Sequence, residues 1–206
     1  MNTYGLSTSE FSILKKLSSP QKIQDFLDTL PFNFEKNGDT YMSPQRVLKE
    51  KKAHCIEGAM LAATALLIQG EKALLLDLKA HPGDMDHVVA LYKKNGYWGA
   101  ISKTNHAVLR FRDPIYKTIR ELVLSYFHEY FLNTTGKKTL RGYSNPLNLK
   151  KFGNKWITAK EDLWIIADAL DDAKHFPFVP EKNKKLIRNA IEIERKAGSI
   201  IEWQEK

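Results

Sequence analysis

Residues 55–69 form an almost unbroken apolar segment made of helix-forming residues. Alanine, leucine, methionine and isoleucine fill most positions between Cys55 and Gln69, and Gly70 follows where a C-terminal cap is expected. A helix that is hydrophobic on all sides needs neighbours on all sides, because any exposed face would leave apolar surface in water. The sequence therefore predicts one central, buried helix around which the remaining elements pack.

The segments around this helix predict further helices and several strands. Asn95-Gly96 is a strong signal for a two-residue hairpin turn, flanked by predicted strands over 87–93 and 97–103. A short apolar run predicts another strand over 73–78. The spacing of apolar residues predicts helices over these segments: 9–17, 20–30, 44–50, 115–131, 158–171 and 181–197.

These elements are expected to form a single domain over 1–206. Helices are expected to precede the central helix. The segment 115–206 is expected to be a helical extension, interrupted by a polar, turn-rich and basic loop over 133–155.

The composition is that of a globular chain. With 43% hydrophobic residues among 206, it can bury roughly 70% of its unfolded surface. No apolar run reaches the roughly 18–20 residues of a membrane span, and the first thirty residues lack a secretory-signal pattern. A single cysteine permits no internal disulfide, which fits a reducing compartment. We therefore expect a cytoplasmic protein without a membrane partner.

The net charge of +8 raises the question of an anionic partner. The lysines lie in separate clusters mixed with acidic residues, at 49–52, 137–138, 150–155 and 182–185. No helix-turn-helix, ribonucleoprotein or zinc-finger pattern accompanies them. The distribution therefore favours solvated faces over nucleic-acid binding.

Cys55 stands at the start of the central helix, where the backbone dipole favours a thiolate. Lowering a thiol pKa from about 8.5 to about 6.5 requires roughly 2.7 kcal/mol, whereas a helix terminus supplies about 0.3–1 kcal/mol. A nearby imidazolium is therefore needed, and His87, at the start of a predicted strand, is the best candidate. His54 is expected not to reach the sulfur, because adjacent helical residues point about 100° apart.

The hairpin register ranks the residues that could orient His87. A two-residue turn pairs Lys94 with Tyr97, which places His87 opposite Thr104 and Ser102 on the diagonal, within reach of a hydrogen bond. One bulge would change this register.

Two alternatives to Ser102 remain open from the sequence. With a bulge, Asn105 would lie opposite His87, and its carbonyl could hold an imidazole tautomer. Asp113 is a more distant acidic option.

The pattern Cys-x-x-x-Ala-x-x-x-Ala-x-x-Leu, a glycine that ends the helix, a strand histidine and a tryptophan-bearing strand resemble the transglutaminase-like branch of the papain-like superfamily. The resemblance covers about 44–104. It implies an α+β fold with a transglutaminase-like core over 44–104, in which the helix of Cys55 packs on a small antiparallel sheet. It also implies a Cys55 nucleophile, a His87 acid and base, and a third member four residues after Trp98, which is Ser102. Family members usually carry aspartate at that position.

The resulting hypothesis is a hydrolase or acyltransferase that acts on a peptide or a small amide or ester through a thioester on Cys55, whose backbone amide contributes to an oxyanion hole. An inactive binding module with the same fold is the main alternative, and a basic nucleic-acid binder is a further one. Candidate substrate-binding residues are Trp98, Arg141 and Tyr143. The sequence leaves the substrate and the oligomeric state open.

No cofactor is expected, and neither is a metal. Several residues of ligand type occur between 54 and 87, but the chain has no Cys-x-x-Cys or His-Glu-x-x-His motif.

Overall fold

The computed structural model describes residues 2–205 and has an α+β architecture. Within this range, seven strands form one antiparallel sheet in the order β4-β3-β2-β1-β5-β7, and β6 also pairs with β1. The strands are β1 Leu74–Ala80, β2 His87–Lys94, β3 Tyr97–Ile101, β4 Arg112–Tyr116, β5 Leu140–Ser144, β6 Leu147–Asn148 and β7 His175–Pro177.

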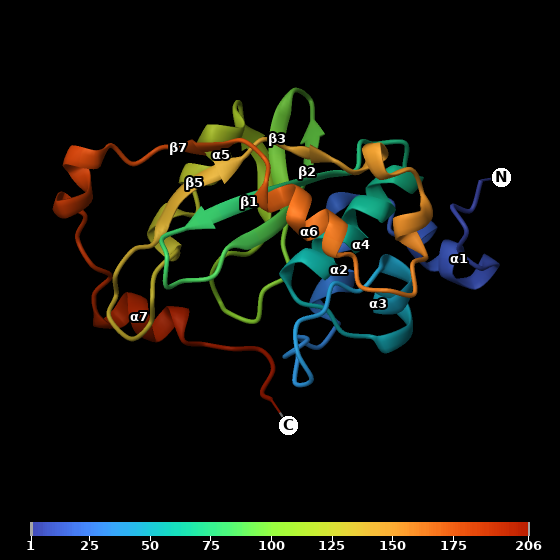
Figure 1. Cartoon of the computed structure of the whole chain (residues 1–206), viewed down its shortest axis with the longest axis horizontal. Coiled ribbons are helices and arrows are strands. Elements are labelled where there is room, and N and C mark those ends of the chain that lie inside the picture. The colour runs from blue at the N-terminus through green and yellow to red at the C-terminus, as the bar shows by residue number, and fades with distance from the viewer. Residues whose placement is uncertain (1, 206) are drawn as a thin grey trace.

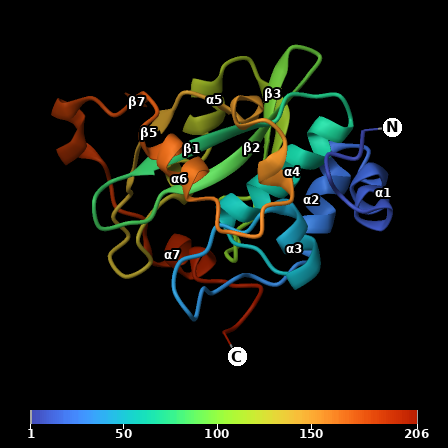
Figure 2. The same cartoon turned by 45° about the vertical axis from the view of Figure 1, so that its right-hand side comes forward.

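The helices gather mainly on one side of this sheet (Figures 1 and 2). They are α1 Thr8–Lys16, α2 Pro20–Asp28, α3 Pro44–Glu50, α4 Cys55–Ile68, α5 Ile119–Leu124, α6 Trp164–Asp171 and α7 Glu192–Gly198. Short 3-10 helices span Phe127–Glu129, Leu149–Phe152, Lys155–Ile157 and Glu181–Leu186. No helix in residues 2–205 has the length and hydropathy needed to span a bilayer.

Serine caps start the helices that surround the centre. The hydroxyls of Ser7, Ser19 and Ser43 accept backbone N–H groups in the first turns of α1, α2 and α3. Proline occupies the first position of α2 and α3, where its missing N–H costs nothing. These local signals explain why the three helices begin where the sequence predicted.

Helix α4 is the buried centre that the sequence predicted. Its residues 58–66 are all buried, and it packs against α1, α2, α3, β1 and β2. Gly58 is needed for one of these contacts, since a Cβ atom there would lie 2.5 Å from the Cβ of Lys103. The close approach holds the start of α4 against the chain that follows β3.

The sheet separates two apolar clusters because alternate residues of a strand face opposite sides. Leu75 and Ala90 belong to the cluster around α4, whereas Leu76 and Val89 belong to the cluster that contains α5. Both faces of the central strands are therefore covered.

The hairpin of β2 and β3 has the predicted register. The pairs run from Lys94 opposite Tyr97 to Ala90 opposite Ile101, without a bulge. Asn95 and Gly96 both have positive φ, at 50° and 87°, as a two-residue turn of this type requires.

The prediction of one helix over 115–131 was wrong. The segment begins in strand β4, continues into the six-residue α5 and ends in a 3-10 turn. The Thr118 hydroxyl caps the start of α5, and the Ser125 hydroxyl donates to the carbonyl of Leu122 at its end. These side-chain bonds to the backbone divide the apolar pattern into shorter pieces.

The prediction of a helical extension over 115–206 was wrong in part. Strands β5 and β6 lie within the expected loop at 133–155, and β7 lies between the last helices. The expected helix over 158–171 is reduced to α6, and that over 181–197 to a 3-10 helix followed by α7. The C-terminal part of the chain therefore completes the sheet on the free edge of β1.

Candidate active site

Cys55 is the first residue of α4 and is partly exposed. The residue before it, His54, has an extended backbone with φ −98° and ψ −170° and forms the N-cap. The thiol thus lies at the amino end of the most deeply buried helix, where backbone N–H groups lack partners within the helix. This position favours negative charge on the sulfur.

His87, the first residue of β2, is held by Ser102. Its Nε2 lies 2.8 Å from the Ser102 Oγ, and the Ser102 hydroxyl donates to the backbone carbonyl of Leu109 at 2.6 Å. A hydroxyl has one hydrogen, so Ser102 must accept from His87 rather than donate to it. The contact therefore fixes the proton on Nε2 and leaves Nδ1 for proton exchange.

Ser102 is itself fixed by Gln24 from α2. The Gln24 side-chain amide donates to the Ser102 carbonyl at 2.8 Å, and its carbonyl accepts the Ser102 N–H at 2.9 Å. Both residues are buried. This two-point contact takes the place of a strand partner just beyond β3 and sets the position of the hydroxyl.

A second imidazole lies on the other side of Cys55. The Nδ1 of His54 lies 3.9 Å from the Cys55 Sγ, and its Nε2 donates to the carbonyl of Thr40 at 2.7 Å. The expectation that His54 could not reach the sulfur was wrong. The 100° argument applies between helical residues, whereas His54 is an extended cap outside the helix.

The side chain of Glu57 contacts both the ring and the backbone of His54. Its carboxylate is fully buried and accepts the backbone N–H groups of His54 and Met42 at 3.0 Å each, and it lies 3.4 Å from the His54 Nε2. Thr40 and Asn33 side chains also donate to it. The surrounding donors keep this carboxylate charged inside the protein.

These contacts determine the charges at the site. Burial opposes ionisation of the Cys55 thiol, but hydrogen bonds and positive charge from His54 and His87 hold its pKa well below its usual range. Burial likewise opposes protonation of His54, but Cys55 and Glu57 raise its pKa to about 11. Burial also opposes ionisation of Glu57, whose pKa is lowered by its bonds to His54. These shifts favour a thiolate on Cys55 beside an imidazolium on His54.

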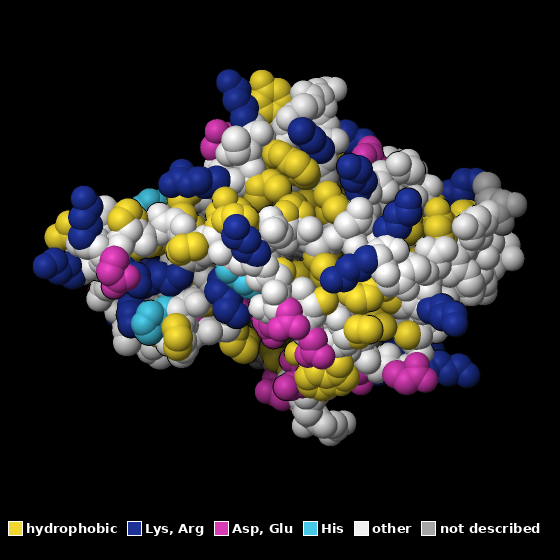
Figure 3. All heavy atoms as spheres, turned by 45° about the horizontal axis from the view of Figure 1, so that its top comes forward, with side chains coloured by type: hydrophobic (Ala, Val, Ile, Leu, Met, Phe, Trp, Pro, Cys, Tyr) yellow, Lys and Arg dark blue, Asp and Glu magenta, His cyan; other side chains and the backbone are white. Residues whose placement is uncertain are grey.

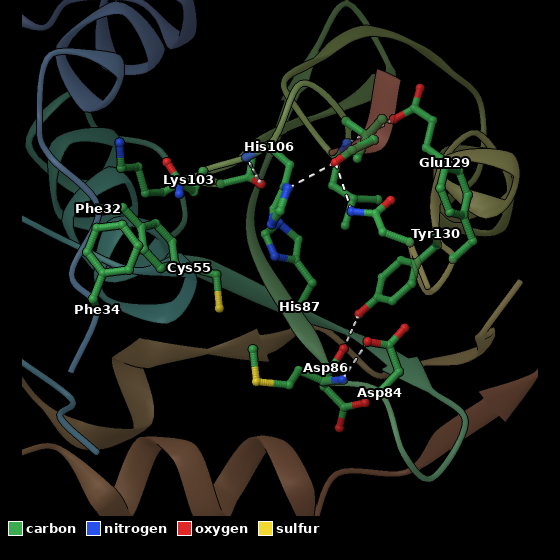
Figure 4. A pocket seen from close by; sticks show the side chains of 18 residues that line it. Phe32, Phe34, Cys55, Asp84, Asp86, His87, Lys103, His106, Glu129 and Tyr130 are labelled. Carbon is green, nitrogen blue, oxygen red and sulfur yellow. Dashed lines mark hydrogen bonds between the residues drawn. The ribbon is translucent and has the colours of Figure 1, made fainter. Parts of the chain in front are cut away.

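Two hollows meet at Cys55. The first, of about 400 Å³, contains His87 and is shown in Figure 4 with Cys55 and His87 on facing sides. Its other lining residues are Phe32, Phe34, Asp84, Met85, Asp86, Lys103, Thr104, Asn105, His106, Val108, Leu109, Glu129, Tyr130, Phe131, Asn133 and Gly198. This first hollow is largely apolar and aromatic near the sulfur.

The second hollow, of about 330 Å³, lies on the His54 side. Besides Cys55 and His54 it is lined by Glu35, Asp39, Tyr41, Ile56, Asp77, Met85, Asp86, Val88, Ala167, Leu170 and Asp171. Cys55, Met85 and Asp86 line both hollows, and Met85 is 82% exposed. The Cys55 thiol thus lies where two chemically different hollows meet.

The structure brings Ser102 to His87, as the hairpin register indicated, and Cys55 lies on the facing side of the same hollow. It separates the alternatives to Ser102. Asn105 lines the first hollow, but its side-chain amide bonds to the backbone N–H and carbonyl of Trp203, both at 2.9 Å. Asn105 anchors the C-terminal segment through these bonds, so the alternative in which it orients His87 was wrong. Asp113 is exposed on β4 and lines neither hollow.

The three candidate substrate-binding residues lie away from the thiol. Trp98 pairs with Lys93 near the hairpin turn, and the Arg141 guanidinium donates to the carbonyls of Leu140 and Lys138. The Tyr143 ring packs on Phe176 with 5.6 Å between centroids. None of the three lines either hollow at Cys55. For Arg141 and Tyr143 the reason is that pairing of β5 with β1 and β7 turns the expected loop into sheet.

One group of carboxylates has metal-ligand geometry. Single oxygens of Asp77, Asp86 and Asp171 lie within 4.8 Å of one another. The Lys79 ammonium already contacts two of them, Asp86 at 2.5 Å and Asp171 at 3.6 Å.

Sequence reasoning missed His54, Glu57 and Gln24 as parts of the site. A signal for the first two was present, since an acidic residue three positions after a helix cap is the pattern of a capping box. Gln24 carried no such signal, because its contact with Ser102 spans 78 positions. The sequence matches no known protein-family model and no curated protein sequence.

Proposed function

We propose that this protein is a cysteine-dependent hydrolase or acyltransferase that acts on an amide or ester through a thioester on Cys55. The observation that carries the proposal is the position of the thiol between two imidazoles, one of them oriented by Ser102. We further propose that the chain has a transglutaminase-like core. A cysteine that opens a central helix and a histidine on the adjacent antiparallel strand support it.

The two histidines have different tasks in this mechanism. His54 is bonded to Thr40 and paired with Glu57, so it stays protonated and stabilises the thiolate. His87 has its Nε2 proton fixed by Ser102, and its Nδ1 can exchange a proton with the reacting groups.

The reaction proceeds in two steps. The Cys55 thiolate attacks the carbonyl carbon, a carbon–sulfur bond forms, and the backbone N–H of Cys55 stabilises the oxyanion. His87 gives its Nδ1 proton to the leaving amine or alcohol as that bond breaks. Water, or another nucleophile, then loses a proton to His87 and attacks the thioester, and Cys55 leaves as the thiolate.

The pH dependence of alkylation tests the activated thiol. We expect the rate of Cys55 modification by iodoacetamide to change little from neutral pH upward, because the thiolate is already formed. An ordinary thiol would gain about tenfold per pH unit below its pKa of about 8.5. A midpoint at or above that value in the native protein would refute the activated thiol.

Turnover of p-nitrophenyl acetate separates the two histidines. His87→Ala is expected to lower turnover by about 100-fold or more, the usual range of general acid–base catalysis, while alkylation stays faster than that of a free thiol. His106→Ala is the matched control, since His106 lines the same hollow but bonds to the Gly198 carbonyl. Rapid alkylation without any acylation of the native protein would favour a binding module with the same fold.

A further inference from the structure

The second hollow has a strongly acidic lining in a protein of net charge +8. It contains five carboxylates, those of Glu35, Asp39, Asp77, Asp86 and Asp171. Figure 3 shows acidic side chains gathered in one group on a face where lysine and arginine are otherwise spread. Among the described residues that line this hollow, His54 is the only cationic one.

The neighbouring cations do not neutralise this acidic lining. Lys79 contacts Asp86 and Asp171, and His175 Nε2 lies 2.8 Å from the Asp77 carboxylate. Together with His54, whose Nε2 lies 3.5 Å from the Glu35 carboxylate, these contacts supply three cationic groups for the five carboxylates of the hollow. Net negative charge therefore remains beside Cys55.

Asp77 supplies an independent indication of a ligand. Its side chain is only 3% exposed and lies in the lining of the hollow. One carboxylate oxygen bonds to His175, whereas the other, Oδ1, is buried and has no hydrogen-bond partner among the described residues. A buried carboxylate oxygen without a donor is costly, and a ligand with N–H groups would satisfy it.

The position of His87 indicates which part of a substrate reaches this hollow. His87 lines the first hollow and not the second, whereas Cys55 lines both. The leaving group must lie on the side of the residue that protonates it, so it occupies the first hollow. The acyl part of the substrate then extends into the acidic hollow.

We propose that the hollow of Glu35, Asp39, Asp77, Asp86 and Asp171 binds an ammonium or guanidinium group carried on the acyl side of the substrate. This inference rests on the proposed acyl transfer at Cys55 for the orientation of the substrate. The carboxylates attract the cation, and the ring of Tyr41 forms part of the wall beside it.

Methanethiosulfonate reagents test the charge preference directly, because Cys55 is the only thiol. The thiolate attacks the sulfenyl sulfur, a disulfide forms and methanesulfinate leaves. The reagents are a trimethylammonium-ethyl, a sulfonate-ethyl and a neutral methyl compound, and N-acetylcysteine amide gives the intrinsic ratio of their rates. We expect the cationic-to-anionic ratio of the protein to exceed that of the free thiol several-fold and to decline between 0.1 and 1 M salt, where the Debye length shortens from about 10 to about 3 Å.

Variants of single carboxylates test whether the second hollow causes this charge preference. Asp171→Asn and Glu35→Gln should each lower the ratio by about threefold, as loss of one nearby charge in a hydrated site implies. Asp172→Asn removes the same charge from the adjacent exposed residue, which lines a different hollow, and should leave the ratio unchanged. A native ratio equal to that of the free thiol, or one unaffected by Asp171→Asn, would overturn the proposal.

The acyl-side assignment is tested with p-nitrophenyl esters of Nα-acetyl-lysine and Nα-acetyl-norleucine. We expect the lysine ester to acylate Cys55 at least about tenfold faster than the norleucine ester, because only the lysine side chain carries a charge for the carboxylates to bind. A tenfold difference in rate corresponds to about 1.4 kcal/mol. The advantage of the lysine ester should be smaller in Asp171→Asn. Equal rates would refute the cation site while leaving acyl transfer intact. Failure of both esters, together with slow reaction of the neutral reagent at pH 7, would instead refute the catalytic function and the acyl-side assignment with it.

Discussion

Removal of the Ser102 hydroxyl is the sharpest test of how His87 is held. Ser102→Ala deletes the acceptor of the His87 Nε2 proton and the donor to the Leu109 carbonyl, while the backbone contacts with Gln24 remain. His87 is only 7% exposed, so its N–H would lose its partner in a buried place. The change thus isolates one hydroxyl without removing the strand.

The expected losses of stability and of turnover follow from the hydrogen bonds that Ser102 makes to His87 and to the Leu109 carbonyl. A buried donor left without a partner costs about 1–3 kcal/mol, and we expect the free energy of unfolding to fall by that amount. A hydrogen bond to the imidazolium contributes about 1.5–3 kcal/mol. Because about 1.4 kcal/mol is tenfold in rate, turnover of p-nitrophenyl acetate should fall roughly 10- to 100-fold. Alkylation of Cys55 at neutral pH should fall less, since His54 still stabilises the thiolate.

The assay combines urea unfolding, ester turnover and iodoacetamide alkylation on the same preparations. Thr104→Val is the matched control, because it removes a nearby buried hydroxyl that accepts the His106 N–H instead. Unchanged turnover in a folded Ser102→Ala protein would refute the assigned role of Ser102. An equal loss in Thr104→Val would show that general loosening of the strand end, and not the contact with His87, is responsible.

Two further changes test the supports of the site. Gly58→Ala places a Cβ atom 2.5 Å from the Cβ of Lys103. We therefore expect the free energy of unfolding, measured by thermal denaturation, to fall by about 1–3 kcal/mol and Cys55 alkylation to become slower. A variant as stable as the native protein would contradict the close packing. Glu57→Gln removes a buried charge whose pKa is lowered in the fold, so its stabilisation is present at neutral pH and lost as the pH falls through that pKa. We expect Glu57→Gln to lower the free energy of unfolding in urea at pH 7 by about 3–5 kcal/mol and to make stability less dependent on acid pH. The variant should also raise the pKa of Cys55 measured by alkylation. An unchanged thiol pKa would contradict the support of His54 by Glu57.

The parts of the structure that depend on neighbouring residues could be predicted from the sequence. The hairpin register follows from Asn95-Gly96, and it predicts that Ser102 lies near His87, as the structure shows. The buried helix follows from its own apolar residues. Both predictions rest on interactions within a few residues or across one tight turn.

The parts that failed depend on distant segments or on the conformation of single residues. Arg141 and Tyr143 were placed in a loop because nothing local to them shows that β1 offers a free edge to pair with. His54 was judged as a helical residue, although its extended backbone puts it outside the helix. The carboxylates of the second hollow come from segments as far apart as Glu35 and Asp171, so no sequence window contains them together.

The serine at position 102 also explains how the site can differ from the aspartate of the transglutaminase-like pattern. At this position the side chain must accept from His87 and also satisfy the Leu109 carbonyl, which lies 2.6 Å from the hydroxyl. An ionised carboxylate can only accept, so it would leave that carbonyl facing a negative charge. A hydroxyl meets both requirements, but it carries no negative charge to stabilise an imidazolium. The buried carboxylate at the site is that of Glu57, which contacts His54 and not His87. In the proposed mechanism, the serine therefore orients His87, while the buried Glu57 carboxylate supports His54, the imidazole that stabilises the thiolate.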